Sequence, residues 1–294
     1  MKRNDAAVGF IGLGVMGGPM AGHLVAGGYE ACVYNRSPQK VTEWLAKYQG
    51  EAAASPGELA LKVKNIVACV GNDDDLREIT IGSMGAIPNM SAGSVFVDHS
   101  TTSADVAREI ADIAAKYDVH FLDAPVSGGQ AGAQAGQLTV MCGGSKQAYD
   151  LAEPMISCYA KASNLMGPSG AGQLTKMVNQ ICIAGLLQGL SEGLNFGMRA
   201  GLDMDQVIDV IAKGAAQSWQ MDNRAKTMCR DEFDFGFAVD LMRKDLGIVI
   251  AEAETQNAAL PVTKLVDEYY AELQSCGYHR LDTSSLIKLL RDEN

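Results

Sequence analysis

Three glycines near the start of the chain have the spacing of a phosphate-binding loop. Gly12, Gly14 and Gly17 come directly after the apolar segment Ala7–Ile11 and open a segment of helical pattern. In this arrangement the first glycine permits a tight turn, the second lets the backbone approach a pyrophosphate, and the third lets the helix pack against the strand. The helix N-terminus adds amide donors and partial positive charge. We therefore predict that a dinucleotide binds residues Gly12, Leu13, Gly14, Val15, Met16 and Gly17.

The end of the second predicted strand indicates which dinucleotide binds. Enzymes that use NAD usually carry Asp or Glu there to bind the ribose 2′-hydroxyl. This chain has Asn35 instead, followed by Arg36 and Ser37. Arg36 can bind a 2′-phosphate through two hydrogen bonds, and Ser37 can donate another; the alternative is that Arg36 is an ordinary solvated turn residue. We predict NADP as the cofactor, with NADPH preferred over NADH.

A lysine in the middle of the chain has the chemistry to move a proton. If the predicted NADP serves in hydride transfer, the protein also needs one group that accepts or donates a proton. Lys176 lies one or two turns into a long predicted helix, among mostly apolar neighbours that favour its neutral form. Asn179 and Gln180 follow on the same helix face, where they can bind substrate or orient the lysine. The alternative is a surface lysine whose stem covers apolar neighbours.

A serine followed by two glycines has the groups that bind a carboxylate. Ser127, Gly128 and Gly129 come after the fifth predicted strand, at the carboxyl edge where α/β proteins bind ligands. The glycines expose backbone amides and the serine adds a hydroxyl, so this segment can hold a substrate carboxylate. The alternative is an ordinary glycine turn.

These segments need a frame of alternating strands and helices, and residues 1–165 have that pattern. The strand candidates are short apolar runs, which are typical of strands buried on both faces of a parallel sheet. Helical patterns such as Ser103–Lys116 lie between them. We predict an α/β Rossmann domain with a doubly wound sheet. Its predicted strands are Ala7–Ile11, Ala31–Asn35, Asn65–Val70, Ser94–Asp98, His120–Asp123 and Leu138–Cys142.

The pattern changes after the segment Gly167-Pro168-Ser169-Gly170. From Ala171 to Met198 the sequence has one long helical pattern without proline, and it stays helical in character beyond. We predict that residues 1–168 form an NADP-binding Rossmann domain. Residues 169–294 are predicted to form an all-α domain for the substrate and for oligomerisation, joined by a long interdomain helix.

The composition excludes several classes of protein. The 294 residues include 24 Lys and Arg against 35 Asp and Glu, a net charge of −11, so nucleic acid is not expected as a partner. No apolar run approaches the length of about 18 residues that a membrane span needs, and glycines and Pro19 interrupt the stretch that follows Lys2-Arg3. Seven widely spaced cysteines fit the free thiols of a cytoplasmic protein. The four histidines lack ligand spacing, so no metal is predicted.

Four ordered motifs give the chain a resemblance to a known family. They are Asp98–Thr101, Asp123–Gly129, Gly170–Gln180 and Met242–Leu246. With the Gly-Leu-Gly-x-Met-Gly start, they resemble the β-hydroxyacid dehydrogenase family over nearly the whole chain. That family includes 3-hydroxyisobutyrate dehydrogenase, tartronate semialdehyde reductase and the glyoxylate/succinic semialdehyde reductases, and 6-phosphogluconate dehydrogenase is a longer relative.

The resemblance implies particular roles for residues in these motifs. It implies Lys176 as the catalytic residue and Ser127-Gly128-Gly129 as the carboxylate site. Gly71 stands in a cofactor loop where relatives often have proline. Phe237 is implied as an apolar wall of the substrate pocket, with a plain core aromatic as the alternative. The other implied residues are Val70, Gly71, Asn72, Thr101 and Lys244 for the cofactor, and Asn179, Gln180 and Asp245 for the substrate.

Together these features predict an NADP-dependent oxidoreductase. It would transfer a hydride between the nicotinamide and a short β-hydroxy acid or its semialdehyde, so the partner is a small hydroxy acid or aldehyde that bears a carboxylate. Two alternatives stay open: an imine reductase-like enzyme, although related enzymes of that kind tend to replace the lysine, and a catalytically silent NADP-binding sensor. We expect a homodimer or homotetramer, because the helical domain leaves apolar surface to cover.

Overall fold

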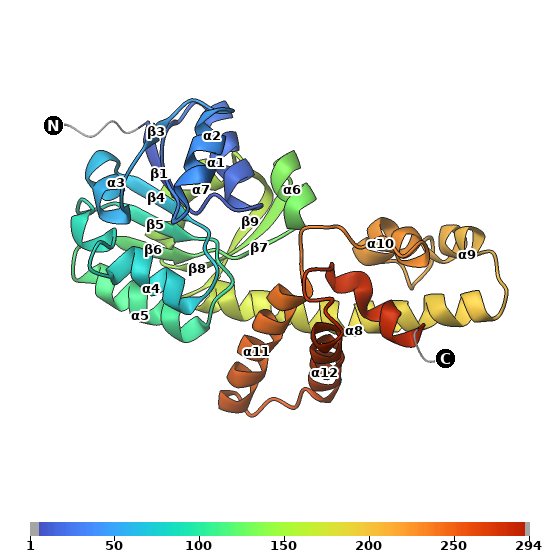
Figure 1. Ribbon diagram of the computed structural model, residues 1–294. Helices are drawn as coiled ribbons and strands as arrows, with labels where there is room; N and C mark the ends of the chain where they lie inside the picture. The colour runs from blue at the N-terminus through green and yellow to red at the C-terminus, as the bar shows by residue number, and fades with distance from the viewer. Residues whose placement is uncertain (1–5, 292–294) are drawn as a thin grey trace. The chain divides into compact units, whose positions relative to one another are not determined.

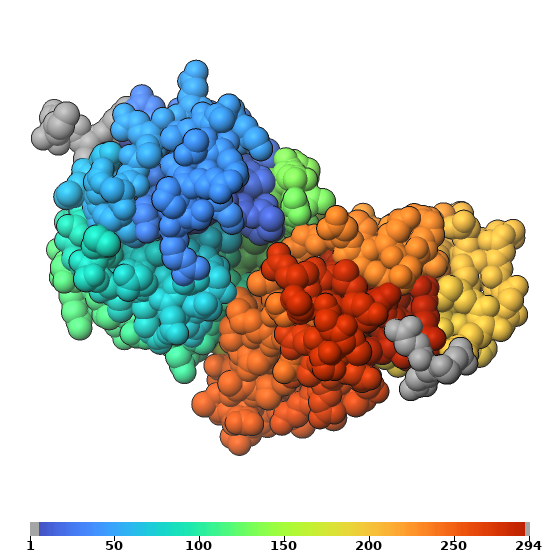
Figure 2. Space-filling view, in the orientation of Figure 1, coloured from blue at the N-terminus to red at the C-terminus, as the bar shows by residue number. Residues whose placement is uncertain are grey.

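The computed structural model describes residues 6–291, and the chain divides into two compact units. The first unit ends at Lys176 and the second begins at Met177. Figure 1 shows strands and helices in the first unit and helices in the second, and Figure 2 shows the same units in space-filling form, from blue to green and from yellow to red. Each unit is described here by itself.

The first unit contains a nine-stranded sheet whose first six strands are parallel (Figure 1). Their spatial order is β3-β2-β1-β4-β5-β6, the order of a Rossmann domain. Two later strands, β7 and β8, run antiparallel to each other, β8 also pairs antiparallel with β6, and β9 pairs parallel with β8. The strands are β1 (Ala7–Ile11), β2 (Glu30–Tyr34), β3 (Glu51–Ala52), β4 (Asn65–Ala68), β5 (Val95–Asp98), β6 (His120–Asp123), β7 (Val126–Ser127), β8 (Leu138–Gly144) and β9 (Ala160–Gly167).

Helices cover both faces of this sheet, as the doubly wound prediction requires. On one face, Met20 and Leu24 of α1 and Met155 of α7 pack with Phe10 of β1 in one apolar cluster. On the other face, Leu59 of α3, Leu76 of α4 and Ile110 of α5 form a second cluster with Ile66 of β4. The helices are α1 (Gly17–Ala26), α2 (Pro38–Leu45), α3 (Pro56–Lys62), α4 (Asp73–Ile81), α5 (Ala104–Ala115), α6 (Gly129–Ala135) and α7 (Lys146–Ile156), with a short 3₁₀ turn η1 (Ile87–Asn89).

Side-chain caps fix where several of these helices begin. Ser55, Asn72, Ser103 and Ser145 each accept a hydrogen bond from the backbone amide three residues later. Such caps satisfy amides that have no partner within the helix and stabilise it by about 1 kcal/mol each. The turns after β3, β4, β5 and β8 are therefore fixed locally, and the first three lie at the carboxyl edge of the parallel strands.

The second unit is helical. Helix α8 (Ala171–Arg199) begins in the first unit and continues into the second. It is followed by α9 (Met204–Ile211), α10 (Trp219–Cys229), α11 (Val239–Thr255), α12 (Pro261–Ser275) and the 3₁₀ segment η2 (Thr283–Leu290). Leu187 of α8, Leu246 of α11 and Tyr270 of α12 share one apolar core. A second core joins α8 with α9 and α10. No helix among the described residues is long and apolar enough to cross a membrane.

The predicted fold class is confirmed, with shifts at the ends of elements. All six predicted strands are present within two residues of their predicted ends, the predicted helix Ser103–Lys116 is α5, and the long predicted helix is α8. Three strands were not predicted. β3 and β7 have two residues each, and β9 alternates half-buried and exposed residues of mixed polarity, so none forms an apolar run.

Candidate active site

The glycine loop follows β1, and two of its three glycines are required by the backbone itself. Gly12 has a φ of +97°, and a Cβ there would overlap the carbonyl oxygen of Cys69. A Cβ on Gly17 would overlap the carbonyl oxygen of Gly12, so α1 can begin close to the loop only with glycine at that position. At Gly14 a Cβ would meet nothing within 4 Å. The loop is therefore open beside Gly14, which fits a pyrophosphate approaching its backbone.

Asn35, which follows β2, is hydrogen-bonded to this loop. Its Oδ1 accepts a hydrogen bond from Leu13 N at 2.8 Å, and its Nδ2 donates to Ser37 O at 3.1 Å. Gly12 N also donates to Tyr34 O at 2.9 Å. Sequence reasoning treated Asn35 as the replacement for a ribose-binding acid. The structure adds that its amide ties the glycine loop to the turn that carries Arg36.

Arg36 is paired with the carboxylate of Asp75, a residue that the sequence analysis did not single out. Its Nη1 lies 2.7 Å from Oδ1 of Asp75, and the Arg36 side chain is 85% exposed against 24% for Asp75. Asp75 lies in the first turn of α4, where its amide donates to Oδ1 of the N-cap residue Asn72 at 2.8 Å. Val70 N donates to Ser100 Oγ at 2.8 Å. These bonds hold the predicted cofactor loop Val70-Gly71-Asn72 beside the end of β5 and beside the Arg36 turn.

The segment after β5 contains Thr101, which is half-buried, and the buried His99. His99 Nδ1 lies 2.6 Å from Ala124 O and Nε2 lies 2.8 Å from Tyr159 Oη. A carbonyl oxygen only accepts, so we assign the proton to Nδ1, and Nε2 accepts from the tyrosine hydroxyl. Burial lowers the pKa of His99 to about 4. This histidine is therefore neutral at neutral pH, and both of its ring nitrogens are engaged inside the first unit, which gives it a structural role.

The Ser127-Gly128-Gly129 segment has a backbone that favours glycine. Gly128 and Gly129 have φ values of +131° and +60°, and α6 begins at Gly129. At the other end of α6, His23 Nε2 lies 3.0 Å from Ala133 O and 3.1 Å from Gln134 O. Because His23 is in the last turn of α1, this contact links the helix of the glycine loop to the helix of the Ser127 segment.

Lys176 lies next to the Ser127 segment. Its side chain is buried, with 7% exposed, and its Nζ donates a hydrogen bond to Val126 O at 2.9 Å. Val126 directly precedes Ser127. The structure therefore brings together a primary amine and the loop predicted to hold a carboxylate, at the carboxyl edge of the first unit's sheet.

Two buried residues that sequence reasoning did not single out hold the start of α8. Asp123, at the end of β6, accepts hydrogen bonds from Gly170 N at 2.8 Å and Gln173 N at 3.0 Å. The Gln173 side chain accepts from Thr102 N at 3.1 Å and donates to Ser100 O at 2.8 Å. Burial raises the pKa of Asp123 to about 6, although these backbone bonds lower it. Lys176 therefore stands on a helix turn that is anchored to two strand ends.

Gly172 makes room for this anchor, which gives a stability prediction. An alanine at 172 would overlap Met141 O and place its Cβ 2.5 Å from Asp123 O, so we expect Gly172→Ala to lower the free energy of unfolding by about 1–3 kcal/mol. Gly247→Ala in α11 is the matched control, because a Cβ there meets nothing within 4 Å; it should be neutral or stabilising by up to about 1 kcal/mol. Thermal melts of both variants measure this, and equal melting temperatures would contradict it.

In the second unit, four of the predicted site residues form a connected polar group: Asn179, Gln180, Lys244 and Asp245. Gln180 is fully buried; its Nε2 donates to Asp245 Oδ2 at 2.7 Å, and its Oε1 accepts from Asn179 Nδ2 at 2.8 Å. Lys244 Nζ lies 3.2 Å from Asp245 Oδ1. Phe237 is half-buried and packs against the core of α8, α11 and α12. Asn179 is the more accessible of the two amides and is better placed to meet a small ligand.

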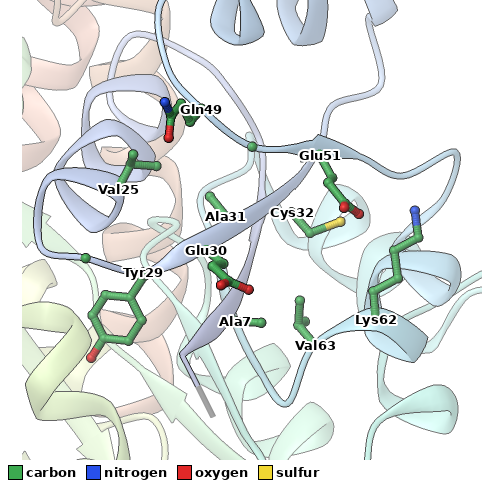
Figure 3. A pocket seen from close by; sticks show the side chains of 12 residues that line it. Ala7, Val25, Tyr29, Glu30, Ala31, Cys32, Gln49, Glu51, Lys62 and Val63 are labelled. Carbon is green, nitrogen blue, oxygen red and sulfur yellow. The ribbon is translucent and has the colours of Figure 1, made fainter. Parts of the chain in front are cut away.

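A hollow lies at the opposite end of the parallel strands, away from the glycine loop and Lys176. It measures about 590 Å³ and lies where β1 and β2 begin, at Ala7 and Glu30 (Figure 3). The carboxylates of Glu30 and Glu51 line it together with Lys62. The amine of Lys62 is already engaged, with Glu58 at 3.0 Å and Ala52 O at 3.1 Å. Two carboxylates beside a neutralised lysine make this hollow unsuited to a dinucleotide phosphate.

The fold and the site in the first unit define a class of protein: a dehydrogenase with a Rossmann domain for a nicotinamide dinucleotide. Residues 7–169 match the family described as the NAD binding domain of 6-phosphogluconate dehydrogenase. Residues 170–290 match the one described as the NAD-binding domain of NADP-dependent 3-hydroxyisobutyrate dehydrogenase. The chain belongs to the β-hydroxyacid dehydrogenase family, and it is an NAD(P)-binding oxidoreductase that acts on CH–OH groups.

Individual relatives agree with this assignment. The chain is 56% identical to an uncharacterized oxidoreductase of Shewanella frigidimarina, over 97% of this chain and 98% of that one. It is 32% identical to the mitochondrial 3-hydroxyisobutyrate dehydrogenase of Mus musculus, over 97% and 87% of the two chains. A crystal structure of 3-hydroxyisobutyrate dehydrogenase from Salmonella typhimurium superposes with a TM-score of 0.86 at 31% identity, covering 96% of this chain and 99% of that one.

Proposed function

We propose that this protein is an NADP-dependent dehydrogenase of short β-hydroxy acids and of the matching semialdehydes. One observation carries the proposal: Lys176 Nζ lies 2.9 Å from Val126 O, directly beside the Ser127-Gly128-Gly129 segment. A group that can move a proton and a segment that can hold a carboxylate are the two protein parts that this reaction needs. Residues 1–168 would form the NADP-binding domain, and residues 169–294 the all-α domain for the substrate and for oligomerisation.

In the proposed mechanism, each residue has one task. A bound nicotinamide supplies or accepts the hydride. The hydroxyl of Ser127 and the amides of Gly128 and Gly129 bind the substrate carboxylate. Lys176 takes the alcohol proton when the substrate is oxidised and gives it back to the carbonyl oxygen when the substrate is reduced. We assign the other residues as follows: Thr101 and Lys244 to the nicotinamide side, and Asn179, Gln180, Phe237 and Asp245 to the substrate side.

The cofactor preference is proposed from the residues that follow β2. Asn35 carries no charge, whereas Arg36 presents an exposed guanidinium, which suits a phosphate better than a hydroxyl. The family description that matches residues 170–290 also names an NADP-dependent enzyme. We propose that the chain prefers NADPH to NADH.

Replacing Arg36 tests this preference. Arg36→Ala should weaken NADPH binding by about tenfold, the loss expected for hydrogen bonds to a charged group, and should leave NADH binding within about twofold. Titration of nucleotide fluorescence gives both dissociation constants. The preference is refuted if the unmodified chain binds NADH at least as tightly as NADPH, or if Arg36→Ala leaves the ratio unchanged.

An assay of several substrates tests the activity itself. The purified chain would be offered 3-hydroxyisobutyrate, tartronate semialdehyde, glyoxylate and succinic semialdehyde with each cofactor, and the nicotinamide absorbance would be followed. We expect turnover with at least one of them, and faster turnover with the phosphorylated cofactor. If none of them turns over although NADPH binds, the proposed activity is wrong.

We also propose a homodimer or homotetramer in the cytoplasm. Val178, Leu186 and Phe196 of α8 are 61%, 38% and 73% exposed, and an apolar helix face of this kind is usually covered. All seven cysteines are free thiols, which fits a reducing compartment. Sedimentation velocity tests the assembly, and a monomer at micromolar concentration would refute it.

A further inference from the structure

We propose that Asp75 limits the preference for the phosphorylated cofactor, because it competes with the 2′-phosphate for the guanidinium of Arg36. The inference rests on the proposed function, since it takes Arg36 as the phosphate ligand. It adds a residue to the cofactor site that neither the glycine loop nor the end of β2 contains.

The first observation is the pair itself. Nη1 of Arg36 lies 2.7 Å from Oδ1 of Asp75, and 39 residues separate the two in the sequence. The Arg36 side chain is 85% exposed, so few protein atoms pack against it, whereas the Asp75 side chain is only 24% exposed. The surrounding protein therefore restrains the carboxylate more than the guanidinium. A phosphate that binds Arg36 must take it from Asp75 or share it with Asp75.

The second observation is that the backbone makes room for this carboxylate. A Cβ on Gly71 would lie 2.8 Å from Oδ2 of Asp75, so the bare backbone at position 71 leaves the space that the carboxylate fills. Asp75 is also held by its amide, which donates to Asn72 Oδ1 at 2.8 Å. It lies in the first turn of α4, where the helix amides favour a negative charge. The position of Asp75 is therefore built into the loop.

The third observation concerns Asn35, which occupies the usual ribose-binding position. Both ends of its amide already hold backbone groups, those of Leu13 and Ser37. The turn beside that position carries the ion pair of the Arg36 guanidinium and the Asp75 carboxylate. A 2′-phosphate is attracted by the first and repelled by the second, whereas a 2′-hydroxyl can donate to the carboxylate without breaking the pair. Asp75 thereby disfavours NADPH and tolerates NADH.

Neutralising Asp75 tests this competition, with Asp74 as the matched control. Asp74 lies in the same first turn and carries the same charge, but its side chain is 97% exposed and pairs with Arg77 at 3.4 Å. Nucleotide dissociation constants would be measured by fluorescence titration for Asp75→Asn, Asp74→Asn and the unmodified chain. We expect Asp75→Asn to tighten NADPH binding by about three- to tenfold, and Asp74→Asn to change it by less than about twofold.

Salt and the double variant make the test sharper. The gain in Asp75→Asn should shrink between 50 and 500 mM salt, because exposed charges are screened within about 10 Å at 0.1 M ionic strength. In the Arg36→Ala background, Asp75→Asn should tighten NADPH binding less than it does in the unmodified chain, because the competition for the guanidinium is gone and only the direct repulsion between Asp75 and the phosphate is relieved.

The outcomes separate this inference from the proposed function. If Arg36→Ala weakens NADPH binding but Asp75→Asn leaves it unchanged or weakens it, the competition is wrong and the NADPH preference stands. Equal gains in Asp75→Asn and Asp74→Asn would reduce the effect to overall charge and overturn the inference. If Arg36→Ala leaves NADPH binding unchanged, the proposed phosphate ligand fails, and the inference fails with it.

Discussion

Lys176→Ala is expected to lower kcat by a factor of about 10²–10⁴, which is the usual contribution of one general acid–base group. The reason is the position of the amine: its Nζ is buried and hydrogen-bonded to Val126 O beside the predicted carboxylate segment. The affinity for NADPH should stay within about twofold, because the proposed phosphate contacts lie elsewhere in the first unit. Steady-state kinetics and nucleotide titration measure the two effects separately.

Three controls make this result specific to the amine. Lys176→Met keeps an apolar stem of similar length, so it should fold as the unmodified chain does and lose the same activity. Lys116→Ala removes an exposed lysine at the end of α5 and should change kcat by less than about twofold. Added ethylamine should restore part of the activity of Lys176→Ala. If turnover survives within about tenfold, roughly 1.4 kcal/mol of barrier, Lys176 is not the general acid–base group.

The glycine loop should respond in opposite ways at Gly14 and Gly17. Gly14→Ala places a methyl group where no protein atom lies within 4 Å, so the melting temperature should stay within about 2 °C, as expected for a change below 0.5 kcal/mol. If the pyrophosphate approaches this backbone, the same methyl group should weaken the binding of both NADPH and NADH by at least about tenfold, or 1.4 kcal/mol.

Gly17→Ala serves as the contrasting variant. Its methyl group would overlap the carbonyl oxygen of Gly12 and approach the Phe10 ring to 2.9 Å. The loop or α1 must therefore shift, and we expect the free energy of unfolding to fall by about 1–3 kcal/mol. Nucleotide binding by Gly14→Ala at the affinity of the unmodified chain would show that the pyrophosphate does not lie against Gly14.

Local patterns in the sequence were sufficient to predict the Rossmann fold of the first unit. The apolar runs predicted five of the first six strands, which are parallel, and the glycine spacing predicted the loop between β1 and α1. These features depend on neighbours within a few residues, such as the cap that Ser103 provides for α5. β9 was missed because its half-exposed, mixed residues carry no such pattern.

The contacts that shape the candidate site could not be predicted, because they join residues far apart in the chain. Asp123 and the amide of Gln173 are 50 residues apart, Gln180 and Asp245 are 65 apart, and Arg36 and Asp75 are 39 apart. The sequence shows an acidic residue at position 75 but not its partner. Only the packing of α4 beside the turn after β2 brings Asp75 to Arg36. The sequence predicted Arg36 as a ligand of the 2′-phosphate, and the structure shows its guanidinium paired with Asp75.

The two hydrogen bonds of Asn35 have a consequence for redesigning the cofactor preference. The simplest change toward an NAD enzyme would place a carboxylate at position 35, where such enzymes carry their acid. One oxygen would still accept from Leu13 N, but the other would replace the amide that donates to Ser37 O and would face that carbonyl oxygen instead. The substitution would therefore set two acceptors against each other at the base of the glycine loop. Engineering toward NADH is better begun at position 36, on the exposed side of the same turn.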